Sequence, residues 1–120
     1  YHENVGIVTS NSNAVTLDLS SAQNFVLTVT EKVDQFTITN IPSDASAFTI
    51  KITQDSTGGY EVGLNTFRTG AGTSIPVHFP GGNVIPGITT TAERSDIYTY
   101  KTFDGGDNFF GVVGGQNFLV

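Results

Sequence analysis

The feature that most constrains the fold of this chain is an alternation of apolar and polar residues with a period of two. The clearest run is residues 48–53, in which Phe, Ile and Ile alternate with Thr, Lys and Thr. Similar runs lie at residues 15–19, 25–30, 36–39 and 75–79. Successive side chains of a β-strand point to opposite faces, so each run predicts a strand with one buried face.

Turn-forming residues separate these runs and set the expected architecture. Residues 40–44 predict a loop around a proline, residues 55–59 predict a hairpin turn with two glycines, and residues 104–107 predict a further turn. A short helical turn is expected only near residues 20–23. Evenly spaced strands with one polar face predict an all-β fold, an antiparallel β-sandwich of jelly-roll type with roughly eight strands.

Length and charge narrow the range of functions. The 120 residues suit one domain over residues 1–120, and the absence of cysteine excludes both disulfides and zinc thiolate sites. The net charge is −6, and the five Lys and Arg residues are dispersed along the chain, which argues against binding to nucleic acid. No apolar stretch is long enough for a membrane-spanning helix, so no membrane partner is expected.

Catalytic machinery is not recognisable in the sequence. Nucleophilic catalysis usually needs a histidine beside a Ser, Cys or Thr, but His2 is terminal and His78 is expected to point outward from a strand. None of the eleven acidic residues stands out as a glycosidase pair. Asp104 and Asp107 offer oxygen ligands in a glycine-rich turn, for which an ordinary turn is favoured over a calcium site. We therefore expect no enzyme activity, no cofactor and no metal.

Candidate contact residues lie in the second half of the chain. Tyr98 and Tyr100 share one strand face and are the expected exposed or interfacial pair, because strands at residues 96–103 and 109–113 carry large apolar groups on both faces. The irregular stretch at residues 68–86 reads either as a functional loop or, more simply, as a crossover between sheets. The remaining contact candidates are loop or strand-surface residues: Arg68, His78, Asp104 and Asp107.

An ordered series of short motifs resembles a β-rich domain of virion proteins of tailed bacteriophages, including those that infect cyanobacteria. The motifs that carry the resemblance span residues 14–20, 24–25, 48–59, 79–82, 89–92, 95–97, 103–106 and 110–118. The resemblance covers nearly the whole chain, and it carries over no catalytic residue.

The resemblance implies a virion structural protein on an extracellular particle. The expected role is a fibre or tip domain that contacts the host surface and assembles as a homo-oligomer, most simply a homotrimer. Its partners would be itself, other virion proteins, and a host-surface glycan or protein. The alternatives are a capsid decoration (cement) protein, a soluble carbohydrate-binding module and, least favoured, a small glycosidase or depolymerase.

Overall fold

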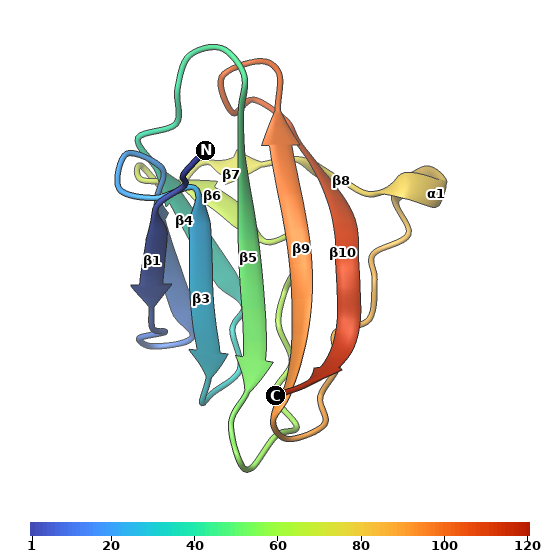
Figure 1. Ribbon diagram of the computed structural model, residues 1–120. Coiled ribbons are helices and arrows are strands. Elements are labelled where there is room, and N and C mark those ends of the chain that lie inside the picture. Colours follow the sequence, from blue (N-terminus) through green and yellow to red (C-terminus); the bar gives the residue numbers. More distant parts are fainter.

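The computed structural model describes all 120 residues as two facing β-sheets with almost no helix (Figure 1). The larger sheet has six strands in the order β1 (Val5–Val8), β3 (Asn24–Val29), β5 (Ser46–Gln54), β9 (Arg94–Thr102), β10 (Phe109–Leu119) and β8 (Val77–His78). The smaller sheet has the order β2 (Ala14–Asp18), β4 (Gln35–Thr39), β6 (Phe67–Thr69) and β7 (Ser74–Ile75). The predicted all-β, sandwich-like architecture is confirmed.

The first six strands alternate between the two sheets. The odd-numbered strands enter the larger sheet and the even-numbered strands the smaller one, so successive strands of one sheet run in the same direction. Five of the eight strand pairings are parallel, among them β1 with β3, β3 with β5, β2 with β4 and β4 with β6. The prediction of an antiparallel sandwich is therefore wrong for this half of the chain. Each consecutive pair of strands places one strand in each sheet, as one coil of a β-solenoid does, and the coils stack on each other.

Short connections explain why the chain makes coils instead of hairpins. Residues 19–23 carry the chain from β2 in the smaller sheet to β3 in the larger one, and residues 30–34 carry it back from β3 to β4. The Asp18 carboxylate fixes the first of these connections by accepting hydrogen bonds from the Ser20 amide and from Asn40 Nδ2, both at 2.9 Å. This connection is a turn and not the predicted helical turn, and the one helix, α1 (Pro80–Asn83), lies elsewhere.

The second half of the chain pairs mainly in the antiparallel sense. Strand β9 pairs antiparallel with both β5 and β10, and residues 103–108 form the connecting turn that the sequence predicts between the last two strands. Residues 55–59 form a turn held by the Asp55 carboxylate, but not a hairpin, because β5 pairs with β9 and not with the strand that follows it. Strand β5 therefore joins the parallel coils to the antiparallel part.

The core between the sheets consists of the inward residues of the alternating runs. Phe48 lies at its centre, with its ring centroid within 6.1 Å of four others, those of Phe25, Phe67, Tyr100 and Phe109. Gly111 on β10 allows the Phe79 ring to approach the backbone closely, because a Cβ there would lie 2.5 Å from Phe79 Cε1. These contacts fix β10 and the segment before α1 against the rest of the fold.

Candidate functional site

Tyr98 and Tyr100 do not form an exposed pair, so that prediction is wrong. Their residues are 0% and 2% exposed, and both rings lie inside the core. The Tyr100 hydroxyl donates to the Leu64 carbonyl at 2.8 Å, and the Tyr98 hydroxyl donates to Asp96 Oδ2 at 2.7 Å. Burial raises the pKa of both phenols, and the Asp96 carboxylate raises that of Tyr98 further. Both tyrosines therefore have structural roles within one copy of the chain.

Asp96 is a buried carboxylate whose importance the sequence did not reveal. Its oxygens accept hydrogen bonds from the backbone amides of Thr89 and Asn117, both at 2.8 Å, and from the hydroxyl of Tyr98. Burial alone would raise the pKa of Asp96, but these donors outweigh it and hold the pKa below its ordinary value. Asp96 thus ties the loop before β9 and the end of β10 to one buried acceptor, which is an architectural role.

The other predicted contact residues fall into two separate places. Arg68 lies on β6 in the smaller sheet, where its Nη1 donates to the Gly72 carbonyl. His78 Nε2 and Asn108 Oδ1 are 2.9 Å apart, and Asn108 Nδ2 donates to Asp104 Oδ2, so His78 and Asp104 share one corner of the molecule. Hydrogen bonds from the side chain and amide of Asn108 lower the pKa of Asp104. Asp107 is exposed in the same turn.

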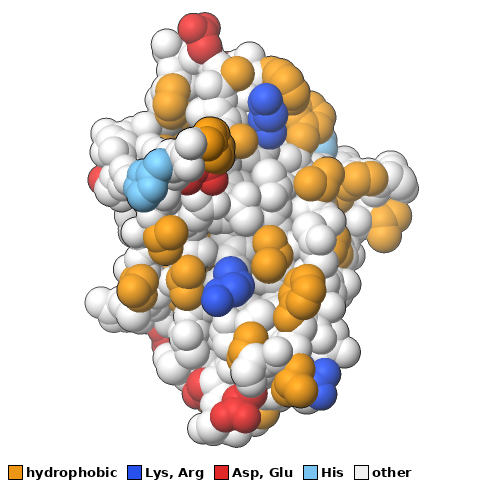
Figure 2. Space-filling model, viewed as in Figure 1, with side chains coloured by type: hydrophobic (Ala, Val, Ile, Leu, Met, Phe, Trp, Pro, Cys, Tyr) orange, Lys and Arg blue, Asp and Glu red, His pale blue; other side chains and the backbone are white.

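The outer face of the larger sheet is uncovered, and strand register arranges its side chains in rows. One row crosses the sheet through Ile7, Val26, Lys51 and Ile97 to β10. The next row runs from Val5 through Asn24, Thr49 and Thr99 to Val112. Figure 2 shows this face: hydrophobic side chains lie on both sides of a central basic side chain, and further hydrophobic side chains lie along the right-hand edge. Parallel strands are normally covered on both sides, so an open apolar face on such strands is unusual.

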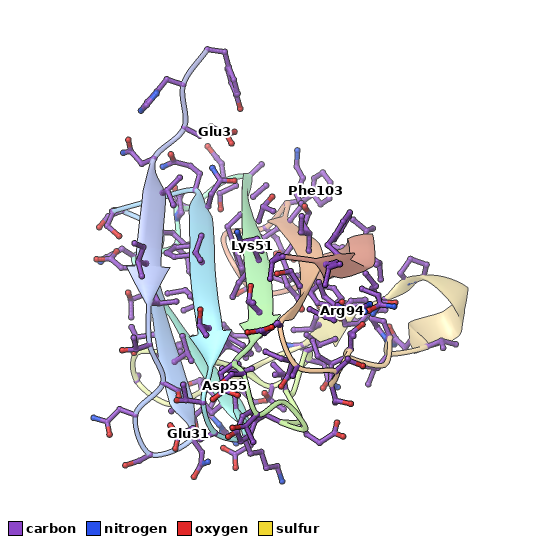
Figure 3. All side chains as sticks on the ribbon, turned by 60° about the horizontal axis from the view of Figure 1, so that its bottom comes forward. Glu3, Glu31, Lys51, Asp55, Arg94 and Phe103 are labelled. Atoms are coloured by element: carbon purple, nitrogen blue, oxygen red, sulfur yellow. The ribbon has the colours of Figure 1, made fainter.

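Polar groups on the middle of this face are satisfied by each other. Thr49 Oγ1 and Thr99 Oγ1 are 3.0 Å apart, and Thr53 Oγ1 and Ser95 Oγ are 2.7 Å apart, so each pair forms a cross-strand hydrogen bond. Lys51 stands on β5 (Figure 3) among uncharged neighbours, with Val26 and Ile97 directly beside it on the flanking strands. Because these hydroxyls already bond to each other, a partner molecule that covered this part of the face and displaced its water would leave few polar groups without a hydrogen bond.

The apolar part of the face is concentrated along β10. We call four exposed residues the β10 strip: Phe103, Phe110, Val112 and Phe118. At one end of the strip the Phe110 ring stacks on the His78 ring, with 5.2 Å between the ring centroids, and packs edge-to-face with the Phe103 ring, with 6.1 Å between the centroids. The Lys101 ammonium lies 5.2 Å from the centre of the Phe103 ring. The expectation that this strand carries apolar groups on both faces is confirmed, since Phe109 is buried on the opposite face.

The smaller sheet presents a different outer face. Thr16, Thr37 and Arg68 form its central row, and Gln35 and Thr39 point the same way from β4. This is the ordinary polar exterior of a half-buried sheet. The contrast shows that the apolar outer face is a property of the larger sheet alone.

A second apolar feature projects from the edge of the larger sheet. We call residues 80–86, which contain α1, the arm; it extends away from the sandwich beside β8 (Figure 1). No residue between 69 and 92 is Asp, Glu, Lys or Arg. Val84 is 67% exposed and Ile85 48% exposed, so the aliphatic side chains of the arm do not contact the core.

The structure contains no cleft beside these surfaces. Its one pocket is an internal gap between the sheets, lined only by core residues such as Leu17, Phe36 and Ile52. No group of three or more His, Cys, Asp or Glu side chains is placed to hold a metal ion. None of the helical structure is long and apolar enough to cross a membrane.

The candidate site is therefore an open surface: the outer face of the larger sheet, the β10 strip along its edge and the arm beside it. Comparisons of the chain with protein-family models, with curated proteins and with solved structures found no match.

Proposed function

We propose that this chain is a structural protein of a tailed-bacteriophage particle, a fibre or tip domain that contacts the host surface and assembles as a homo-oligomer. It acts by binding and not by catalysis. The observation that carries the proposal is the uncovered outer face of the larger sheet, with its paired hydroxyls and its apolar β10 strip. A surface of this kind suits contact with another macromolecule, because apolar area is gained and few polar groups lose their partners.

The resemblance of the sequence motifs to phage virion domains directs the proposal to a virus particle. The chain's composition is compatible with that setting, since it contains no thiol to oxidise and its net charge of −6 disfavours adhesion to packaged DNA.

Mass spectrometry of purified particles tests this function. The chain is expected among the particle proteins, and a copy number of a few to a few dozen fits a fibre or tip position. A copy number in the hundreds would instead favour the alternative role of a capsid decoration protein. Absence of the chain from particles of the phage whose genome encodes it contradicts the proposal.

Carbohydrate binding is a second candidate, favoured by the exposed aromatic corner of the β10 strip. Phe103 and Phe110 are exposed and could stack on sugar rings. The Phe110 ring stacks on His78, which contacts the Asn108 amide, and this amide in turn donates to the Asp104 carboxylate. Aromatic side chains beside polar groups are common in sugar sites.

A glycan array followed by titration of the isolated chain tests this candidate. Binding should be lost in Phe110→Ala and retained in Thr16→Ala, which alters an exposed residue of the smaller sheet. A glycan that binds both variants equally well would place its site elsewhere, and an array without any binder would remove the candidate.

A further inference from the structure

We infer that a second copy of this chain covers the β10 strip, and that the arm of each copy docks on the strip of its neighbour. The inference rests on the proposed function, because it identifies the surface through which the homo-oligomer forms. It commits to one occupant, a second copy, and to one geometry, arm to strip.

The shape of the arm carries the first step of the argument. Its base is fixed at one end by Phe79, which is buried against Tyr100, and at the other by Thr89, whose amide donates to Asp96. Between these anchors lies one tight turn, in which Gly81, Gly82 and Asn83 all have positive φ. All residues of the arm from Pro80 to Ile85 are exposed, so the arm does not bury these side chains against its own domain.

Internal hydrogen bonds give the arm a defined conformation before it meets a partner. The Asn83 side chain accepts from the Phe79 amide at 3.0 Å, the Asn83 amide donates to the Phe79 carbonyl at 3.0 Å, and the Val84 amide donates to the Pro80 carbonyl at 3.3 Å. Val84 and Ile85 are thus presented to solvent on an ordered backbone. Binding by a preformed element loses less conformational entropy than binding by a flexible one.

The β10 strip is the apolar surface that matches the arm. No residue of the strip or of the arm is charged, although the chain as a whole carries a net charge of −6, so contact between these residues places no like charges face to face. Strip and arm also lie on the same side of the sandwich, beside β8 and β10 (Figures 1 and 2). Each copy therefore presents both halves of the contact side by side.

The available area is sufficient for a stable assembly. The exposed parts of the strip residues and of Val84 and Ile85 amount to about 600 Å² of largely apolar surface per copy. A standard interface takes about 800 Å² from each partner, of which somewhat more than half is apolar. Because arm and strip lie side by side on each copy, two copies related by a two-fold axis can form both contacts at once, and each copy then contributes the whole of this area to one interface.

Light scattering of three proteins tests the assembly surface. The wild-type chain should run as an oligomer, a multiple of 12.7 kDa. Ile85→Asp in the arm and Phe110→Asp in the strip should each give a folded monomer, because both residues are exposed and a buried aspartate would be unpaired at the contact. Thr16→Asp on the smaller sheet is the matched control and should remain an oligomer. Circular dichroism and thermal unfolding of each variant check that the fold is intact.

Mixing the two monomeric variants distinguishes arm-to-strip docking from packing of strip on strip. The Phe110→Asp chain keeps an intact arm and the Ile85→Asp chain keeps an intact strip, so the mixture should form one contact and a mass of twice 12.7 kDa. A mixture that stays monomeric contradicts the arm-to-strip contact, and an Ile85→Asp chain that remains an oligomer on its own shows that strips pack on strips.

The absence of cysteine permits a direct proximity test. Ile85→Cys in one chain and Val112→Cys in another should form a disulfide-linked heterodimer under mild oxidation, since a disulfide needs its two Cα atoms within about 7 Å. Ser74→Cys in place of Ile85→Cys should give little of this product. Equal yields from the two pairings contradict docking of the arm on the strip.

Two outcomes separate this inference from the proposed function. An oligomeric wild type whose mass is unchanged by both aspartate variants uses another surface, which overturns the inference and leaves the virion role standing. A monomeric wild type also overturns the inference, and the virion role is then decided by the copy number of the chain in particles.

Discussion

Replacing Asp96 by asparagine should destabilise the fold strongly, although the two side chains have nearly the same shape. The carboxylate accepts from the amides of Thr89 and Asn117, from the Tyr98 hydroxyl and, at 3.4 Å, from Gln116 Nε2. An asparagine offers one oxygen and turns an NH₂ group toward the remaining donors, so at least one backbone amide loses its acceptor. Hydrogen bonds to a charged group contribute about 1.5–3 kcal/mol each, and the expected loss is about 3 kcal/mol.

Urea unfolding followed by circular dichroism measures this loss. With an m value of about 2 kcal/mol/M, a loss of that size lowers the unfolding midpoint by about 1.5 M. Asp107→Asn is the matched control: it removes the same charge from an exposed turn residue and should change stability by no more than about 0.5 kcal/mol. A loss below about 1 kcal/mol for Asp96→Asn, with unchanged m, would refute the reasoning that the carboxylate holds these segments together.

Three further predictions concern the same part of the fold. Wild-type stability should fall as the pH drops below about 4, because the pKa of Asp96 is lower in the folded than in the unfolded state and its ionised form therefore stabilises the fold. Urea midpoints measured from pH 6 to pH 2 should decline less steeply in Asp96→Asn than in the wild type. Gly111→Ala should cost about 1–3 kcal/mol in urea unfolding, since its Cβ would lie 2.5 Å from Phe79 Cε1, and a neutral result would mean that the ring moves freely. Tyr100→Phe should cost about 1–2 kcal/mol by leaving the buried Leu64 carbonyl without its donor, and a stabilised variant would contradict that bond's importance.

The period-two alternation predicted which residues are buried. Val15, Leu17, Phe48 and Ile50 all lie in the core as expected. Alternation reports the face of a side chain and not the direction of the neighbouring strand, so it could not distinguish parallel from antiparallel pairing. The general rule that parallel sheets are covered on both faces favoured the antiparallel interpretation, and stacked coils are an exception to it.

One sequence signal for the coils was present. A threonine stands between two apolar residues at positions 15–17 and again at positions 36–38, and these two triplets pair in register in the smaller sheet. Such a repeat at a separation of about twenty residues is typical of a solenoid coil. Its residues also suit any strand, so the pattern gains its meaning only from the pairing.

The candidate site depends on register, which the sequence did not provide. Ile7, Val26, Lys51 and Ile97 lie far apart along the chain and form one row only because four strands align them. The two tyrosines were misassigned for a different reason. With apolar groups on both faces of their strand, the sequence did not show which face turns inward, and the face that carries both tyrosines is the core face, where Leu64 and Asp96 accept from their hydroxyls.

The position of β5 between the parallel coils and the antiparallel strands also bears on how the domain can change its length. Strands β1 and β2 contact the rest of the fold through β3 and β4, which present a comparable pair of edges of their own. Insertion or deletion of one whole coil at that end would add or remove one strand in each sheet, change the length of the sandwich by one strand spacing of about 5 Å, and leave β9, β10 and the arm in place. Such a change would leave the β10 strip and the arm as they are, and only the rows of the outer face that cross β1 would gain or lose a residue.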